Sequence, residues 1–383
     1  DNQRLDADRE RVRFNPLHTE CDFLRLASQL KQQTPMSAEA LAEARAALDQ
    51  PLLAGLDLPN QGKFQSWLTA MRADAEALRL QLSPDFVPAA SPPMESGRLH
   101  LARQRIGFCT TPDDARIAYA RIGQGPVLIK AANWLSHLEH DWDSPIWSPL
   151  LQELARDRCL IRYDERGNGM SDWNVAALGF DSFVSDLECV VAASGEAKFP
   201  LLGISQGVAV AIEYAARHPE RVSHLILWGG YAAGWRVDGD ADLRAEREAI
   251  ITLVGQGWGR EDPIYRQIFS RAFLPSATTE ELAGFDAFQR LTTSPANAAR
   301  FLNAFADIDV RHRLADVRCP TLVMHARGDK RVPVEQSARI AAGIAGAEFV
   351  TLATDNHLLL GREPASALLV ARVREFLGGA AGL

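Results

Sequence analysis

From about residue 104 onward the chain alternates short apolar runs with helical segments, and this alternation constrains its fold more than any other feature. The apolar runs are bounded by turns and are typical of strands that are buried on both faces. We expect strands at 105–110, 115–122, 127–131, 159–164, 201–204, 224–228, 321–325 and 348–351. We expect helices at 149–155, 180–193, 206–218, 333–344 and 365–377. This order predicts an α/β fold, in which helices cover both faces of a mostly parallel sheet.

A change in composition divides the chain of 383 residues into two parts. In the first part Leu and Ala recur at steps of three and four residues, which predicts a small helical N-terminal domain over 1–82. Residues 83–103 are rich in proline and form the expected linker. The second domain covers 104–383, and its alternation is interrupted at about 231–314 by an insertion with helical periodicity and many aromatic residues.

Composition and charge argue against several classes of function. The net charge of −8 is unfavourable for a broad nucleic-acid surface on this chain. The five cysteines are scattered without C-x-x-C spacing, so we expect reduced thiols in a cytoplasmic protein and no metal site. No apolar run approaches the roughly 20 residues that span a bilayer, and no nucleotide or flavin motif occurs, so we expect neither membrane nor cofactor. Because residue 1 is Asp and not Met, we expect native sequence upstream.

The segment Gly203–Ile204–Ser205–Gln206–Gly207 fits the pattern G-x-S-x-G between a predicted strand and a predicted helix. Its two glycines permit a sharp turn that lifts the serine hydroxyl above the edge of the sheet. The N-terminus of the following helix favours negative charge at the same place. The pattern also arises by chance in ordinary turns, but the strand–turn–helix context favours Ser205 as a nucleophile.

A serine nucleophile needs a base, and the base needs an acid that orients it. Asp329 and His357 follow the last two predicted strands, in loops at the carboxyl edge of the sheet, where open α/β sheets place their sites. The alternative for His357 is an ordinary surface loop, and Asp355 is a rival acid that lies too close to His357 in sequence. We therefore predict a catalytic triad of Ser205, His357 and Asp329.

Together these motifs resemble the α/β-hydrolase family over about 104–378, nearly end to end. The order Ser…Asp…His is the one found in that family. Residues 163–172 resemble the family's loop after its fourth strand, and 214–222 and 319–323 match equally familiar stretches. The resemblance implies the α/β-hydrolase fold, and it implies that the insertion at about 231–314 is a helical cap over the pocket.

One segment departs from the family pattern. Family members usually carry His-Gly after the third strand, where this chain has Ala131–Ala132. The resemblance implies that the main-chain N–H groups of Gln206 and Asn133 form the oxyanion hole. Because backbone groups carry this role, the departure changes the shape of the loop without removing the donors.

Aromatic residues near the expected pocket are candidates for substrate contact. The predicted substrate-binding residues are Trp134, His137, Tyr231 and Trp235. Trp142 and Trp147 follow in the same cluster, and the favoured alternative for the cluster is that it packs the cap against the sheet. The aromatic residues of the cap favour a small apolar ligand.

The stretch 130–147 resembles hydrolase-like domains that bacteria fuse to transcriptional or signalling modules. Residues 5–14 and 52–72 resemble part of a bacterial transcriptional activator domain, which normally follows a winged-helix DNA-binding domain. The resemblance implies contact with DNA only through a domain upstream of residue 1. The alternative is a helical docking appendage that joins two copies in a homodimer.

Three functions are compatible with these observations. The main hypothesis is a ligand-sensing and hydrolytic domain of a bacterial transcriptional regulator, which acts on a small apolar ester, lactone or amide by Ser-His-Asp acyl transfer. The alternatives are a stand-alone metabolic serine esterase and a non-catalytic small-molecule receptor. The complete triad argues against the receptor, since a pure binder has no chemical need for Asp329 and His357, whereas the altered oxyanion loop favours it.

Overall fold

A computed structural model describes residues 100, 103–258, 260 and 269–378, and the backbone alone of 5–7 and 12–14. The chain divides into two compact units, Asp1–Ala90 and Ser91–Leu383. In the first unit, β1 (Leu5–Ala7) and β2 (Val12–Phe14) pair antiparallel. The helices predicted within 1–82 and the predicted linker up to residue 99 lie outside the described residues, so the N-terminal domain stays a prediction.

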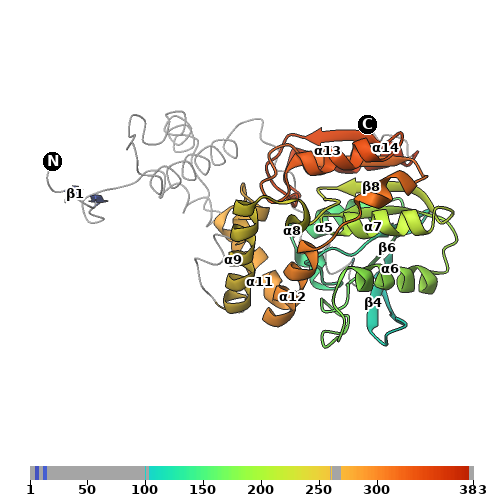
Figure 1. Cartoon of the computed structure of the whole chain (residues 1–383), viewed down its shortest axis with the longest axis horizontal. Helices are drawn as coiled ribbons and strands as arrows, with labels where there is room; N and C mark the ends of the chain where they lie inside the picture. The colour runs from blue at the N-terminus through green and yellow to red at the C-terminus, as the bar shows by residue number, and fades with distance from the viewer. Residues whose placement is uncertain are drawn as a thin grey trace, which may run out of the picture. The chain divides into compact units, whose positions relative to one another are not determined.

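The second unit is built on one eight-stranded sheet with the order β10-β9-β8-β7-β5-β6-β4-β3 (Figure 1). Its strands are β3 (Arg105–Thr110), β4 (Arg116–Ile122), β5 (Val127–Lys130), β6 (Cys159–Tyr163), β7 (Phe199–Ile204), β8 (Val222–Trp228), β9 (Thr321–Ala326) and β10 (Glu348–Leu352). Strands β5 to β10 run parallel to one another, whereas β4 pairs antiparallel with both β3 and β6. The predicted mostly parallel α/β sheet is confirmed.

Strand β7 begins two residues earlier than predicted. The apolar run predicts a strand that starts at Leu201, and the residue before it, Pro200, lacks the N–H group that a β-ladder needs. In the structure β7 runs through Pro200, and its pairing with β8 changes register between Phe199 and Pro200. This irregularity accommodates the missing donor, so the strand continues to the turn that carries Ser205.

Helices cover both faces of the sheet, as the buried runs predict. The helices outside the insertion are α5 (Trp147–Ala155), α6 (Phe180–Ser194), α7 (Gly207–Arg217), α13 (Val334–Gly343) and α14 (Pro364–Phe376). A Cβ atom at Gly203 would lie 2.9 Å from the Ala211 Cβ atom of α7, so this side of β7 rests on α7. The next residue, Ile204, points to the opposite face and lines a cavity with Leu150 of α5 and Leu369 of α14.

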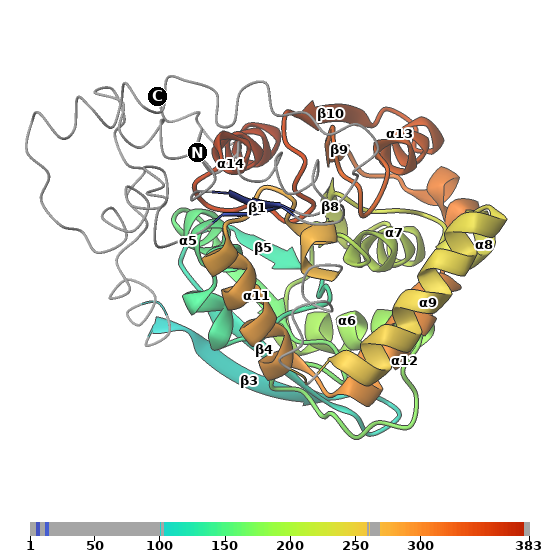
Figure 2. The ribbon, with the colours of Figure 1, turned by 90° about the vertical axis from the view of Figure 1, so that its left-hand side faces the viewer.

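Helices also fill the predicted insertion between β8 and β9. They are α8 (Trp235–Asp238), α9 (Ala241–Gly257), α11 (Thr279–Thr292) and α12 (Pro295–Ala306), and the short helix η2 (Arg311–Asp316) follows them before β9. The short helix η1 (His140–Asp143) lies between β5 and α5. The Asp240 carboxylate accepts the Leu243 N–H at 2.8 Å and caps α9, and Thr278 and Glu281 form a reciprocal capping box on α11. Helices α9 and α12 lie side by side (Figures 1 and 2).

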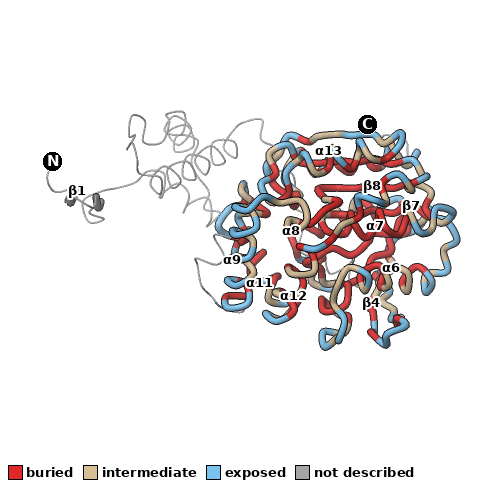
Figure 3. Tube along the Cα trace, viewed as in Figure 1, coloured by how far each residue is buried: buried red, intermediate tan, exposed pale blue. Residues whose placement is uncertain are grey.

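The buried core follows the sheet and the inner faces of these helices (Figure 3). Arg166, in the loop after β6, is fully buried and donates to Asp186 of α6 from its main-chain N–H at 3.0 Å and its Nε at 2.9 Å. This pairing fixes the loop at the carboxyl end of β6, beside the turn that carries Ser205. Within the described part of the chain, no helix is long and apolar enough to cross a membrane.

Candidate active site

Ser205 occupies the turn between β7 and α7 with a φ angle of +53°, a left-handed conformation that few residues other than glycine adopt. The flanking glycines leave no room for side chains. A Cβ atom at Gly203 would lie 2.7 Å from the Gly207 carbonyl oxygen, and one at Gly207 would lie 2.4 Å from the Ala132 carbonyl oxygen. The Ser205 N–H donates to the Trp228 carbonyl oxygen at 2.9 Å, which ties the turn to β8. Both glycines are therefore needed for the sharp turn.

The structure brings the three predicted triad residues together in one hydrogen-bonded chain. His357 Nε2 lies 2.9 Å from Ser205 Oγ, and His357 Nδ1 lies 2.7 Å from Asp329 Oδ2. Asp329 follows β9 and His357 follows β10, so adjacent parallel strands deliver both residues to the same edge as Ser205. The rival acid Asp355 is exposed. This arrangement can pass the serine proton to an imidazole whose other nitrogen is held by a carboxylate.

The surroundings of Asp329 keep its carboxylate ionised. Oδ1 accepts the main-chain N–H groups of Arg331 at 2.8 Å and Val332 at 3.0 Å, and His325 Nε2 lies 3.3 Å from Oδ2. Burial by itself raises the pKa of Asp329. The charge of His357 and the hydrogen bonds from His325, His357 and Val332 outweigh burial and lower that pKa to about 2.

His325 supports the acid and is unsuited to be the base. It lies at the end of β9 and is fully buried. Its Nε2 donates to the Val332 carbonyl oxygen at 2.8 Å, and its Nδ1 lies 2.7 Å from Ser337 Oγ, so both ring nitrogens are occupied. The contact of His325 with Asp329 could not be predicted from the sequence, because only the folded loop brings the two residues together.

His357 is held both by the sheet and by the insertion. Its main-chain N–H donates to the Phe273 carbonyl oxygen at 2.9 Å, and the two rings meet at 72° with centroids 5.6 Å apart. Trp228 Nε1, from the end of β8, donates to the His357 carbonyl oxygen at 3.2 Å. The orientation of the imidazole therefore depends on contacts from two parts of the fold that are far apart in sequence.

The two predicted oxyanion donors lie on adjacent segments. Gln206 precedes the first residue of α7, and its N–H donates to no acceptor within the described residues. Asn133 follows β5, is fully buried, and accepts a hydrogen bond from Lys130 Nζ. The Ala132 carbonyl oxygen, next to Asn133, lies directly against Gly207. The structure places the loop beside the turn that carries Ser205, and the oxyanion roles of Gln206 and Asn133 stay predictions.

Trp134 packs against aromatic residues of the insertion between β8 and β9. Its side chain is buried and stacks on Trp258 of the insertion, with ring centroids 5.2 Å apart and an angle of 18°. Further rings around Trp134 belong to Phe269, Phe301 and Phe305. Trp142 and Trp147 are buried as well, which agrees with the packing alternative for this cluster.

The other three predicted substrate-binding residues are half-buried. His137 Nδ1 accepts main-chain N–H groups from Glu139 at 3.2 Å and from His140 at 3.3 Å. Burial, and then the charge of Glu165, raises the pKa of Tyr231, and the Trp235 ring lies under the guanidinium of its neighbour Arg236 at 4.9 Å. Substrate contact by His137, Tyr231 and Trp235 stays a prediction.

Two buried ionisable residues beside Ser205 were missed by the sequence analysis. Glu165 Oε2 accepts Gln206 Nε2 at 2.8 Å, while its Oε1 finds no partner within the described residues. Burial, and then the charge of Asp186, raises the pKa of Glu165 well above its usual value. Lys130, the last residue of β5, donates to Asn133 Oδ1 at 2.5 Å, and burial lowers its pKa to about 8. The sequence offered a signal only for Lys130, which is a charged residue at the end of an apolar run.

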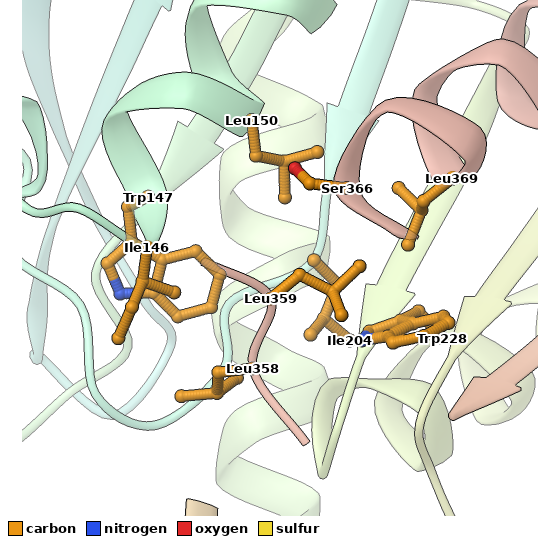
Figure 4. A pocket seen from close by; sticks show the side chains of 9 residues that line it. All are labelled: Ile146, Trp147, Leu150, Ile204, Trp228, Leu358, Leu359, Ser366 and Leu369. Atoms are coloured by element: carbon orange, nitrogen blue, oxygen red, sulfur yellow. The ribbon is translucent and has the colours of Figure 1, made fainter. Parts of the chain in front are cut away.

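A small cavity lies behind the proposed site, between the sheet and helices α5 and α14 (Figure 4). Its lining residues are Ile146, Trp147, Leu150, Ile204, Trp228, Leu358, Leu359, Ser366 and Leu369. Ile204 precedes Ser205 and Leu358 follows His357, so the cavity faces the backbones of two triad residues. Its nearly apolar lining makes it part of the packing that supports the site.

Comparison with known proteins gives the class to which this fold and site belong. Residues 138–364 match the family model described as alpha/beta hydrolase fold, which is more than half of the chain. The chain belongs to the α/β-hydrolase fold family.

Two similar proteins carry the names of different hydrolytic activities. The chain is 28% identical over 225 residues to a putative carbamate hydrolase, RutD, of Rhizobium rhizogenes, which covers 57% of this chain and 82% of the relative. It is 25% identical over 265 residues to the pyrrolizixenacetamide deacetylase of Xenorhabdus hominickii, covering 68% and 94% of the two chains.

Solved structures with the same fold include a hydrolase from Pseudomonas aeruginosa, with a TM-score of 0.59 and 27% identity over 72% of this chain and 99% of that one. A thermophilic esterase from Thermogutta terrifontis also has a TM-score of 0.59, at 21% identity over 72% of this chain and 98% of that one, and supports the fold alone.

Proposed function

We propose that the chain is a serine hydrolase that cleaves a small carboxylic ester, lactone, amide or carbamate by acyl transfer. The observation that carries the proposal is the continuous relay from Ser205 Oγ through His357 to Asp329, at 2.9 Å and 2.7 Å. A nucleophile on a left-handed turn, a base in contact with it and an ionised acid behind the base are the parts that acyl transfer needs.

The proposed reaction begins when His357 Nε2 removes the Ser205 proton as Oγ attacks the carbonyl carbon of the substrate. Asp329 holds Nδ1 and stabilises the imidazolium that forms. The main-chain N–H groups of Gln206 and Asn133 then stabilise the oxyanion. His357 returns the proton to the leaving oxygen or nitrogen, and it next activates a water that releases the acyl group from Ser205.

The names of the relatives support a substrate with an acyl or carbamoyl group. RutD is named as a putative carbamate hydrolase and the Xenorhabdus hominickii protein as a deacetylase. Both names describe hydrolysis at a carbonyl carbon bound to nitrogen or oxygen, which is the chemistry that the relay supports. The buried aromatic rings around Trp134 favour an apolar substituent on that carbonyl.

Labelling with a fluorophosphonate probe, together with turnover of short-chain p-nitrophenyl esters, tests the proposal. In Ser205→Ala we expect labelling to vanish and kcat to fall by several orders of magnitude, to a residual rate of roughly 10³–10⁴ over water. The matched control is Ser223→Ala. Ser223 lies at the start of β8, whereas the Ser205 turn contacts Trp228 at the end of this strand, so the variant should label and react like the native chain. Ser205→Ala with native labelling and turnover would refute the proposed nucleophile.

The comparisons favour the stand-alone hydrolase, which was the alternative hypothesis, over the ligand-sensing domain of a transcriptional regulator. The regulator hypothesis rests on the resemblance of residues 130–147 to fused hydrolase-like domains and on residues 1–82, of which only two short strands are described. The upstream DNA-binding domain, the homodimer through N-terminal helices and the cytoplasmic location stay predictions. The receptor alternative is less favoured, because a pure binder does not require the Ser205–His357–Asp329 relay.

A further inference from the structure

Lys130 stands where the strand pattern calls for an apolar residue. It is the last residue of β5, it is 5% exposed, and both the strand and the loop after it are buried. Burying an ammonium group is unfavourable unless specific partners compensate for the lost water. The contacts of Lys130 therefore indicate what the residue does at this place.

Its one short hydrogen bond goes to the loop that carries a predicted oxyanion donor. Nζ lies 2.5 Å from Asn133 Oδ1 and 3.4 Å from the Ala131 carbonyl oxygen, and it faces the Trp147 ring at 5.3 Å. The Asn133 side chain in turn donates from Nδ2 to the Trp134 carbonyl oxygen at 3.2 Å. Lys130 and the Trp134 peptide thus hold the Asn133 side chain at both ends.

The carboxylates whose charges act on Lys130 are bonded elsewhere. Asp141 accepts from Arg162, Asp164 accepts from Ser136, and Glu165 accepts from Gln206. Within the described residues none of these carboxylates forms an ion pair with Lys130. The bond to Asn133 is therefore the specific interaction of this ammonium group, and nearby negative charge makes its burial tolerable.

The loop that Lys130 holds also touches the turn that carries Ser205. The Ala132 carbonyl oxygen lies so close to Gly207 that a Cβ atom there would be 2.4 Å away, and the Ala131 N–H donates to the Leu202 carbonyl oxygen of β7 at 2.8 Å. A change at Asn133 would thus shift the main chain of this loop, which contacts the turn that carries Ser205. In this chain the loop lacks the His-Gly pair that the family usually carries, so its shape needs another support.

We propose that Lys130 is a positioning residue for the acyl-transfer reaction: through the Asn133 side chain it fixes the main-chain N–H groups after β5 next to Ser205. This inference rests on the proposed function. A donor displaced from the developing oxyanion loses its effect in the transition state while ground-state binding changes little, so kcat falls and KM is nearly constant.

The test compares Lys130→Met, Lys130→Gln and Asn133→Ala by steady-state kinetics on p-nitrophenyl esters. Removal of an oxyanion donor costs roughly 10²–10³ in kcat, and we expect Lys130→Met to approach the lower value with KM within about threefold. Lys130→Gln retains an N–H donor and should recover much of this loss. In the Asn133→Ala background, Lys130→Met should add less than about threefold, because the two residues act as one unit. The exposed Lys198→Met is the matched control.

A native kcat in Lys130→Met, or independent losses that multiply in the double variant, would overturn the inference. An equal loss of kcat in Lys130→Gln and Lys130→Met would also overturn it, because this result is expected if the fold merely needs a positive charge at position 130. If the native chain shows no Ser205-dependent turnover, the proposed function fails, and amide hydrogen exchange over 131–135 still tests Lys130. Exchange there should be about tenfold faster in Lys130→Met than in the native chain, and unchanged exchange would refute the inference.

Discussion

The main-chain N–H of His357 donates to the main-chain carbonyl oxygen of Phe273 at 2.9 Å, and the Phe273 ring meets the imidazole at a steep angle. Phe273 belongs to the insertion between β8 and β9, whereas His357 follows β10. The proposed base is therefore held by a segment of the insertion as well as by the sheet. Packing of the insertion and orientation of the imidazole are coupled through this contact.

Phe273→Ala tests this coupling. Phe273 is buried, so its truncation should lower the free energy of unfolding by about 3–5 kcal/mol, measured by urea denaturation. It should also lower kcat, because the imidazole loses an aromatic neighbour. Phe288→Ala is the matched control, since Phe288 is buried in the same insertion and has no ring contact with His357. The coupling is supported if both variants lose stability equally and only Phe273→Ala has a lower kcat. The same kcat in Phe273→Ala and Phe288→Ala would contradict it.

Asp329→Asn should lower kcat on an ester substrate by about 10⁴, because an amide cannot hold the His357 tautomer that accepts the serine proton. The pKa of Asp329, about 2, keeps the native carboxylate ionised throughout the pH range of the assay. Asp355→Asn, in the same loop as His357 but exposed, is the control and should keep native kcat. Loss of activity in Asp355→Asn in place of Asp329→Asn would reassign the acid.

Glu165 should make stability fall as pH rises. Burial raises the pKa of Glu165 well above its usual value, so between about pH 4.5 and the native pKa the folded chain binds more protons than the unfolded chain. The free energy of unfolding should therefore decrease with rising pH through that window. In Glu165→Gln, which keeps the size of the side chain without the charge, this decrease should be smaller, and Asp141 and Asp186, whose pKa values burial also raises, account for the rest. Urea denaturation of both chains from pH 4.5 to pH 8 measures it, and parallel curves would exclude Glu165 as the source.

Much of the framework could be predicted because periodic patterns are local. The apolar runs located every strand of the eight-stranded sheet to within a few residues. Strand β7 starts two residues earlier than predicted, and a register shift accommodates Pro200. The pattern around Ser205 predicted a strand–turn–helix, and the structure shows why both glycines are required there. The order of the loops sufficed to select Asp329 and His357 as candidates.

Contacts that depend on distant segments could not be predicted in this way. The stacking of the buried Trp134 ring on Trp258, more than a hundred residues away, depends on the fold, and substrate contact by Trp134 stays a prediction. Glu165 looked like one charge in a polar loop, and only the fold places it against the Gln206 side chain. His325 contacts Asp329 only because the loop after β9 folds back onto the end of that strand.

The sequence by itself determined the α/β class, the mostly parallel sheet and the residue types of a Ser-His-Asp relay. Strand burial, glycine turns and loop position are properties of a few neighbouring residues. The tertiary structure decided the 2.9 Å and 2.7 Å contacts of the relay, the hold of Phe273 on His357, and the bond of Lys130 to Asn133. The physical reason is that hydrogen bonds act over about 3 Å and depend on direction, so they exist only once packing has fixed every segment that contributes an atom.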